Sequence, residues 1–250
     1  MKIGKDLEIV EGLPVLYVKS LSAIVCSDLH LGYEGVMADK GHFLPKANLS
    51  NIKKIISEAV RLTGASRIIV DGDIKNEFSK VHIEEFNEFS EFVNYIRKSL
   101  KIREIVLIKG NHDNFIDRYK KALDMKVYSQ EALIGDFLFF HGEELPKSGA
   151  GKTLIMGHIH PAITISNSLG MREKLRCFLY GKMKDGRRVV VVPAMNYFSE
   201  GVGVNIEDPV TMAPVFNSML DIDSMEAYCI GEGEILDFGR IEHLKNFDFQ

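Results

Sequence analysis

Five short apolar runs of the chain each end beside residues of the types that bind metal ions. An apolar run of four or five residues is typical of a buried β-strand, and open sheets bind ligands beyond the carboxyl ends of their strands. The runs are 23–27 before Asp28-Leu29-His30, 68–70 before Asp71-Gly72-Asp73, 105–108 before Lys109-Gly110-Asn111-His112-Asp113, 137–140 before His141-Gly142, and 153–156 before Gly157-His158-Ile159-His160. One such coincidence would carry little weight, but five in one chain predict a single site.

The rest of the pattern predicts alternating strands and helices, followed mostly by strands. The expected elements are a hairpin over 7–18, helices over 48–62, 81–100 and 115–123, and strands over 162–165, 175–180, 188–192, 225–230 and 234–238. Asn48 is of a type that caps helices, and Gly64 follows the end of the first helix. The second helix carries an apolar stripe that we expect to pack in the core, formed by Ile83, Phe86, Phe89, Val93, Ile96 and Leu100.

Composition and charge are those of an ordinary globular protein. A length of 250 residues without a linker rich in Pro, Gly or Ser favours one domain over residues 1–250. The formal charge of -4 lacks the basic excess typical of nucleic-acid-binding domains, although bound cations would make a metal site positive. The apolar stretches are too short to span a membrane and the N-terminus lacks the core of a signal peptide, so we expect a cytoplasmic protein without membrane contact.

The three cysteines, Cys26, Cys177 and Cys229, lie far apart in apolar, strand-like runs. Their number is odd, and no pair has the spacing of a metal-binding or redox CxxC motif. We therefore expect buried free thiols, as is usual in a reducing cytoplasm.

The five motifs, taken in this order, resemble those of the calcineurin-like metallophosphoesterases: Asp-x-His, Gly-Asp-x-x-Asn, Gly-Asn-His-Asp, His-Gly and Gly-His-x-His. The segments from Asp28 to Glu34 and from Phe43 to Pro45 further resemble the archaeal branch usually described as related to SbcD-type nucleases. The resemblance implies an α/β fold of four layers, α-β-β-α, in which two mixed sheets pack face to face with helices outside.

The same resemblance implies a centre of two divalent transition-metal ions. The first ion would be held by Asp28, His30 and His160, the second by Asn111, His141 and His158, and the two would be bridged by Asp73. Ions about 3.5–4 Å apart can share a hydroxide and lower its pKa toward neutrality. The nitrogen and oxygen ligands suit manganese best, with iron or zinc as alternatives. Two carboxylates against two divalent ions leave a positive charge that a phosphate ester can occupy.

His112 has a different expected role, because it lies beside the proposed ligand Asn111. It should hold a phosphate oxygen and protonate the leaving alkoxide as a general acid, and Asn111 and His112 together should contact the phosphate. Many relatives carry a carboxylate at the position of Asn76 to orient this histidine, and nuclease-like relatives often carry histidine. Asn76 can orient an imidazole without adding charge, and Asp113 is expected to shape the turn.

Each motif has an ordinary alternative when it is taken alone. An isolated Asp-x-His or His-Gly is usually a turn or a core histidine, whereas Gly-His-x-His at a strand end projects both imidazoles to one side. Outside the motifs, we expect His82 early in a helix, His243 on the surface and His42 in a loop that could reach the pocket.

The resulting hypothesis is a metal-dependent phosphodiesterase, a hydrolase of ester bonds that acts as a nuclease on DNA. The alternatives are a phosphodiesterase for small molecules or cyclic nucleotides, and an inactive scaffold of the same fold. The basic residues that could follow a nucleic-acid backbone are Lys174, Arg176, Lys182, Lys184, Arg187 and Arg188. Their spread over two strands and a hairpin is more typical of a solvated face. The oligomeric state is left open by the sequence.

Overall fold

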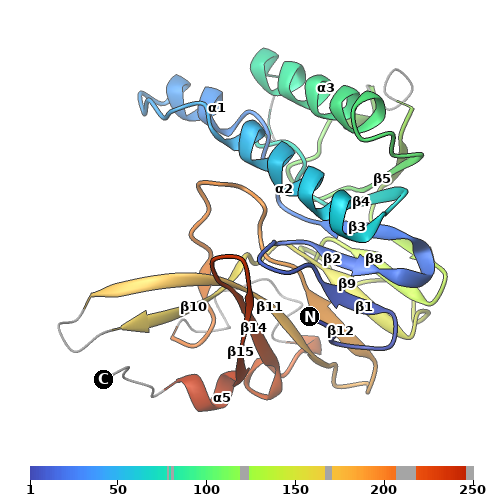
Figure 1. Ribbon diagram of the computed structural model, residues 1–250, viewed down its shortest axis with the longest axis vertical. Helices are drawn as coiled ribbons and strands as arrows, with labels where there is room; N and C mark the ends of the chain where they lie inside the picture. Colours follow the sequence, from blue (N-terminus) through green and yellow to red (C-terminus); the bar gives the residue numbers. More distant parts are fainter. Residues whose placement is uncertain (78, 80–81, 119–123, 167–170, 207–217, 246–250) are drawn as a thin grey trace.

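Two β-sheets packed face to face form the centre of the computed structural model (Figure 1). The structure describes residues 1–77, 79, 82–118, 124–166, 171–206 and 218–245. The first sheet has six strands in the order β1 (Leu7–Ile9), β2 (Leu16–Val18), β3 (Ala23–Cys26), β4 (Arg67–Asp71), β5 (Glu104–Ile108) and β6 (Lys126–Tyr128). The predicted hairpin is confirmed, since β1 and β2 are antiparallel, and β3 to β6 run parallel.

The second sheet has nine strands and is mixed. Its main order is β13 (Val202–Gly203), β10 (Pro161–Ser166), β11 (Arg172–Lys182), β12 (Arg188–Val191), β9 (Thr153–Met156), β8 (Phe137–Phe140) and β7 (Glu131–Ile134). β14 (Glu226–Ile230) pairs with β11 and with β15 (Ile235–Arg240). The strands expected after residue 160 are therefore confirmed. Parallel pairing joins β8 to β9 and β9 to β12.

The alternation of side chains along the strands produces the layers. In β3, Ile24 and Cys26 face a core shared with the helices above the first sheet, while Ala23 and Val25 face the core between the sheets. A third core covers the outer face of the second sheet with Leu220, Ile222 and helix α5 (Ile241–Leu244). The predicted four-layer α-β-β-α architecture is confirmed, with few helices on this second outer face.

Helices α2 (Asn48–Thr63) and α3 (Ile83–Lys98) lie over the first sheet, and α1 (Tyr33–Asp39) contacts α3 (Figure 1). Short 3₁₀ helices occupy Lys19–Leu21, Ile116–Arg118 and Ile222–Ser224. α2 ends at Gly64, whose φ of 66° and backbone bond to Val60 O make the predicted end. The α1 helix was not predicted, because its seven residues carry no sustained apolar period. No helix among the described residues is long and apolar enough to cross a membrane.

Two details of the predicted helices are wrong, and a third lies mostly outside the described residues. Asn48 is the first residue of α2 and does not cap it, because its side chain binds other loops. In α3 the core contacts begin at Phe89, so that Ile83 and Phe86 are 77% and 38% exposed. Of the helix expected over 115–123, only one 3₁₀ turn is present, and residues 119–123 lie outside the described part of the chain. The expected free and buried cysteines are confirmed.

Candidate metal centre

All five predicted metal-binding segments lie at carboxyl ends of strands, as expected. They follow β3, β4 and β5 of the first sheet and β8 and β9 of the second. The two sheets meet at this edge through a parallel bridge between Ser27 and Ala194. The loops of both sheets consequently enclose one site.

The first group of ligand-type atoms comes from two loops, those that follow β3 and β9. The relevant atoms of Asp28, His30 and His160 lie within 4.8 Å of one another. His160 Nε2 is 3.0 Å from Asp28 Oδ1, and Asp28 is fully buried. Three residues predicted to bind the first metal are therefore brought together.

Asp73 lies between this group and a second one. Its Oδ2 is 4.0 Å from His30 Nε2 and 3.2 Å from His141 Nε2. The atoms of Asp73, His141 and His158 form the second group, again within 4.8 Å. This is the position that a carboxylate shared by two ions requires.

The backbone at these residues is held in an unusual conformation. Nine non-glycine residues of the described chain have positive φ, and five of them are the predicted ligands Asp28, His30, Asp73, His158 and His160, at 46° to 72°. Such a conformation costs about 1–3 kcal/mol for each residue and persists where the surrounding structure imposes it, commonly at functional sites. The strained backbone distinguishes these aspartates and histidines from buried residues that only pack in a core.

Backbone and side-chain acceptors outside the motifs orient the imidazoles. His141 Nδ1 donates to the carbonyl oxygen of Asp71 at 2.8 Å, which leaves its Nε2 as the atom available to a metal. His160 Nδ1 lies 3.0 Å from the hydroxyl of Ser199. Sequence reasoning missed both partners, because a main-chain carbonyl has no sequence signature and Ser199 belongs to no motif.

Gly72 allows His141 to approach the loop that carries Asp73. A Cβ at this position would lie 2.0 Å from His141 Nδ1, and the residue has a φ of +85°. A side chain at Gly72 would therefore displace His141 from this loop.

Substitution of Gly72 by alanine should therefore be severe. Gly186 in the turn between β11 and β12 is a matched control, since its φ is +86° and its Cβ would meet nothing within 4 Å. Gly186→Ala should cost about 1–2 kcal/mol from the left-handed backbone alone, whereas Gly72→Ala should cost more than about 4 kcal/mol in unfolding free energy. Urea unfolding of the metal-free variants measures the difference, and equal costs would contradict the close approach.

His112 sits at the edge of the cluster. Its Nε2 is 4.0 Å from Asp73 Oδ2, and its backbone N–H donates to Asp73 Oδ1 at 2.9 Å. Its Nδ1 contacts the backbone carbonyl oxygen of Asn76. Because a carbonyl can only accept, Nδ1 carries a proton and Nε2 is the atom that faces the site. The predicted orienting role of the Asn76 side chain is thus taken by its main chain.

Asn111 and Asp113 lie in the same turn. Asn111 is exposed, between Gly110 and His112. Asp113 is fully buried and accepts the backbone N–H groups of Gly110 and Lys75 at 2.9 and 3.3 Å, so it shapes the turn as expected. Of the other histidines, His82 immediately precedes α3, His243 is on the surface, and His42 is exposed.

Burial and neighbouring charges set the protonation states of the cluster. Burial lowers the pKa of His30 and of His158 to about 4, so both imidazoles are neutral at pH 7. Burial alone would raise the pKa of Asp73, but the charge and the hydrogen bond of His141, together with the charge of His30, outweigh it, and the pKa falls to about 2. The neighbouring carboxylates instead raise the pKa of His141 and of His160. Because neutral imidazole and ionised carboxylate are the forms that bind metal ions, these two histidines would release a proton on metal binding.

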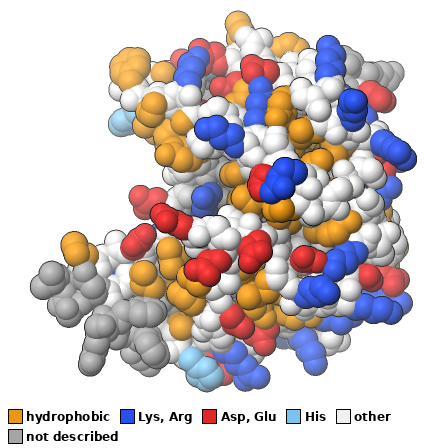
Figure 2. All heavy atoms as spheres, in the orientation of Figure 1, with side chains coloured by type: hydrophobic (Ala, Val, Ile, Leu, Met, Phe, Trp, Pro, Cys, Tyr) orange, Lys and Arg blue, Asp and Glu red, His pale blue; other side chains and the backbone are white. Residues whose placement is uncertain are grey.

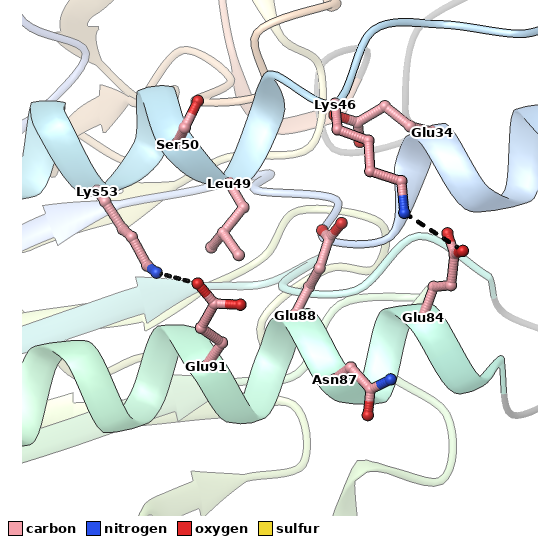
Figure 3. A pocket seen from close by; sticks show the side chains of 9 residues that line it. All are labelled: Glu34, Lys46, Leu49, Ser50, Lys53, Glu84, Asn87, Glu88 and Glu91. Atoms are coloured by element: carbon pink, nitrogen blue, oxygen red, sulfur yellow. Dashed lines mark hydrogen bonds and ion pairs between the residues drawn. The ribbon is translucent and has the colours of Figure 1, made fainter.

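A groove between α2 and α3, shown in Figure 3, is lined by residues that hydrogen-bond to the loop after His30. The groove has a volume of about 430 Å³. On its floor, Glu88 accepts the backbone N–H of Gly32 at 2.8 Å, and Glu34 accepts that of Asn48 at 2.8 Å. The Lys46–Glu84 and Lys53–Glu91 pairs, at 3.3 and 2.5 Å, join its two sides toward either end (Figure 3). We interpret the groove as a place where helices pack and hold the metal-binding loop, and not as a ligand site.

Comparison with known proteins assigns the family. The sequence profile of the calcineurin-like phosphoesterases matches residues 21–184, which is well over half of the chain. The chain belongs to the calcineurin-like phosphoesterase family. As a calcineurin-like phosphoesterase, it is a hydrolase of phosphoester bonds from a family that depends on two metal ions.

Solved structures similar to this calcineurin-like phosphoesterase have low sequence identity to it. The nuclease MPE of Pseudomonas putida is 19% identical with a TM-score of 0.60, and the match covers 92% of this chain and 93% of that one. Yfce, a phosphoesterase from E. coli, is 15% identical with a TM-score of 0.44, over 87% and 98% of the two chains. A search of curated proteins found no match.

The residues present fit the two ions of a calcineurin-like phosphoesterase. Asp28 Oδ1 and His141 Nε2 are buried without a hydrogen-bond partner, although other ligand-type atoms surround them. An unpartnered buried oxygen or nitrogen is costly unless an ion satisfies it. Imidazole and carboxylate donors without thiolate suit first-row transition metals in an open site.

Proposed function

We propose that the protein is a metal-dependent phosphodiesterase that cuts nucleic acid, with DNA as its substrate. The observation that carries the proposal is the placement of His112, an oriented imidazole at the edge of a carboxylate–imidazole cluster. The name of the P. putida nuclease and the resemblance to SbcD-related nucleases support a nucleic-acid substrate. A cytoplasmic location and a single domain over residues 1–250 remain part of this proposal.

The proposed ligands divide into two sets, as the resemblance implies. Asp28, His30 and His160 would hold one ion, His141 and His158 with Asn111 the other, and Asp73 both. Manganese is the first choice for both positions, and iron or zinc also fit the donor set. The bound ions would supply a nucleophile at neutral pH and neutralise charge on the phosphate.

His112 and Asn111 would contact the phosphate itself. His112 donates through Nδ1 to the carbonyl oxygen of Asn76, so its Nε2 faces the substrate, and the doubly protonated imidazolium would give its Nε2 proton to the leaving oxygen. The side chain of His112 is 28% exposed, which lets a substrate reach it. Asp73 accepts the backbone N–H of His112 and fixes the distance between the acid and the cluster.

A small phosphodiester is the second candidate, because three of the six candidate basic residues bind groups of the protein itself. Arg176 is largely buried and donates to the carbonyl oxygens of Ala194 and Asn196 at 3.2 and 3.4 Å. Lys174 donates to Gly201 O, and Arg187 pairs with Asp185 at 2.8 Å. On the face drawn in Figure 2, acidic and basic side chains are interspersed. These contacts favour a structural role over a phosphate track.

The salt dependence of hydrolysis separates the two candidates. Nicking of single-stranded DNA should fall with salt more steeply than hydrolysis of bis(p-nitrophenyl) phosphate, because each neutralised phosphate adds about −0.7 to the log–log slope. Parallel titrations with manganese present measure both slopes. Equal slopes would favour the small substrate. Failure to hydrolyse either substrate with manganese, iron or zinc would favour the inactive scaffold.

A further inference from the structure

We infer that Tyr197, supported by the rings of Phe198 and Tyr33, binds an unpaired nucleobase beside the scissile phosphate. The substrate class is then a phosphodiester that carries an accessible base, supplied by a single strand or by a free nucleotide ester. The inference rests on the proposed phosphodiesterase function and adds a specificity-determining residue to it.

The loop that carries Tyr197 is attached directly to the metal-binding residues. The backbone N–H of Asn196 donates to Asp28 O at 3.0 Å, and Ser199 Oγ lies 3.0 Å from His160 Nδ1. Tyr197 and Phe198 lie between these two attachments. Their side chains are therefore positioned by the same loop that orients a proposed ligand.

A second loop joins from the opposite side. The backbone N–H of Tyr33 donates to His30 O at 3.2 Å. Asn48 links both loops, because its amide nitrogen donates to His30 O at 3.2 Å and its amide oxygen accepts the backbone N–H of Tyr197 at 2.9 Å. The main-chain position of Tyr197 therefore does not depend on its own ring.

The three rings form one group. Phe198 and Tyr33 stack with centroids 5.5 Å apart and planes 19° apart, and Tyr197 meets Phe198 edge-on at 5.2 Å. The stacked pair is half-buried, whereas Tyr197 is 54% exposed. Single exposed aromatic residues are ordinary on protein surfaces. Tyr197 differs because its ring is braced by a neighbour and its backbone is fixed at a candidate catalytic centre.

The loop that carries the group is attached to one end of a row of imidazoles at the metal centre. In this row, the ring centroid of His30 lies 5.0 Å from that of His112 and 5.4 Å from that of His160. The side chains of His112 and His160 are 28% and 24% exposed, while that of His30 is 9% exposed. His160 is the end of the row that touches Ser199. A phosphate over the row would place an adjoining base near Tyr197.

Stacking explains why the base must be unpaired. The faces of a base within a duplex are covered by its neighbours, so an aromatic side chain reaches them only in a single strand or after the base leaves the stack. Aromatic platforms of this kind tolerate any base, because every base has a π-face. We therefore expect single strands to be preferred over duplexes.

Binding to the metal-free protein tests the ring without relying on catalysis. Tyr197→Ala should weaken binding of a fluorescein-labelled oligothymidylate about 5- to 150-fold, the loss expected for one base–aromatic stack. Tyr197→Phe, which keeps the ring, should restore binding. Leu133→Ala, a control at a residue of equal 54% exposure on β7, should have no effect. An abasic oligomer should bind wild type and Tyr197→Ala alike. Equal weakening for the abasic oligomer would overturn the inference.

A pair of esters tests it during turnover. Thymidine 5′-(p-nitrophenyl phosphate) and methyl p-nitrophenyl phosphate share a leaving group but differ in the base. The ratio of their kcat/KM values should fall in Tyr197→Ala and remain unchanged in Tyr197→Phe. A larger effect on the oligonucleotide than on the thymidine ester would identify single strands as the source, and equal effects a free nucleotide ester.

Failure of the stacking role and failure of the proposed phosphodiesterase function would give different results. Wild-type protein that hydrolyses both esters, with an unchanged ratio in Tyr197→Ala, would overturn the stacking role alone. Wild-type protein with no activity on either ester would overturn the proposed phosphodiesterase function. The binding experiment would then still show whether Tyr197 contacts a base.

Discussion

Asp73→Ala should deprive the protein of both metal ions and lower phosphodiester hydrolysis by about 10³-fold or more. The physical reason is that Asp73 Oδ2 lies between His30 at 4.0 Å and His141 at 3.2 Å, where one carboxylate serves both ion positions. Loss of the ions removes the nucleophile available at neutral pH. Metal content after dialysis, measured beside activity, checks the prediction.

Two further variants serve as controls for Asp73→Ala. Asp73→Asn keeps the volume and removes the charge, so it should also lose metal if the carboxylate is the shared ligand. His160→Ala should mainly weaken one position, because His160 belongs only to the group with Asp28 and His30. Two full equivalents of metal retained in Asp73→Ala would contradict the bridging assignment.

His112→Ala should damage cleavage of DNA about 10²–10⁴-fold, the usual contribution of a general acid. Cleavage of bis(p-nitrophenyl) phosphate should fall far less, because p-nitrophenolate leaves without protonation and a sugar alkoxide does not. Metal content should be unchanged, since His112 is assigned as an acid. Kinetics on both substrates with metal analysis measure the three quantities.

Asn76→Ala is the matched control for the acid. The main-chain carbonyl of Asn76, which this variant retains, is the group that contacts His112 Nδ1. Its effect on DNA cleavage should stay within a few-fold, far below the loss in His112→Ala. Equal losses of His112→Ala on both substrates would show that His112 mainly holds the phosphate. Loss of metal would show that it is a ligand.

The sequence predicted the parts of the fold that depend on apolar runs and strand ends. Runs such as 23–27 and 137–140 form buried strands, and the ligands that follow them converge. The resemblance supplied the division between two sheets, which the runs alone do not contain. Asp73 could be named as the bridge from the motif, and its position between two groups supports that role.

Other features depend on tertiary contacts and could not be predicted. The carbonyl oxygens of Asp71 and Asn76 orient His141 and His112, and a main-chain acceptor is the same in every residue. Asn48 matched a helix cap in the sequence, but the structure uses it to join the loops of His30 and Tyr197. The distribution of basic residues likewise gave no sign that Arg176 anchors a loop.

Anomalous diffraction from crystals of the manganese-loaded protein tests the two-ion centre most directly. The structure predicts two peaks, one among Asp28, His30 and His160 and the other beside His141 and His158, with the Asp73 carboxylate touching both. A single peak at full occupancy, or two peaks of which Asp73 touches only one, would contradict this account.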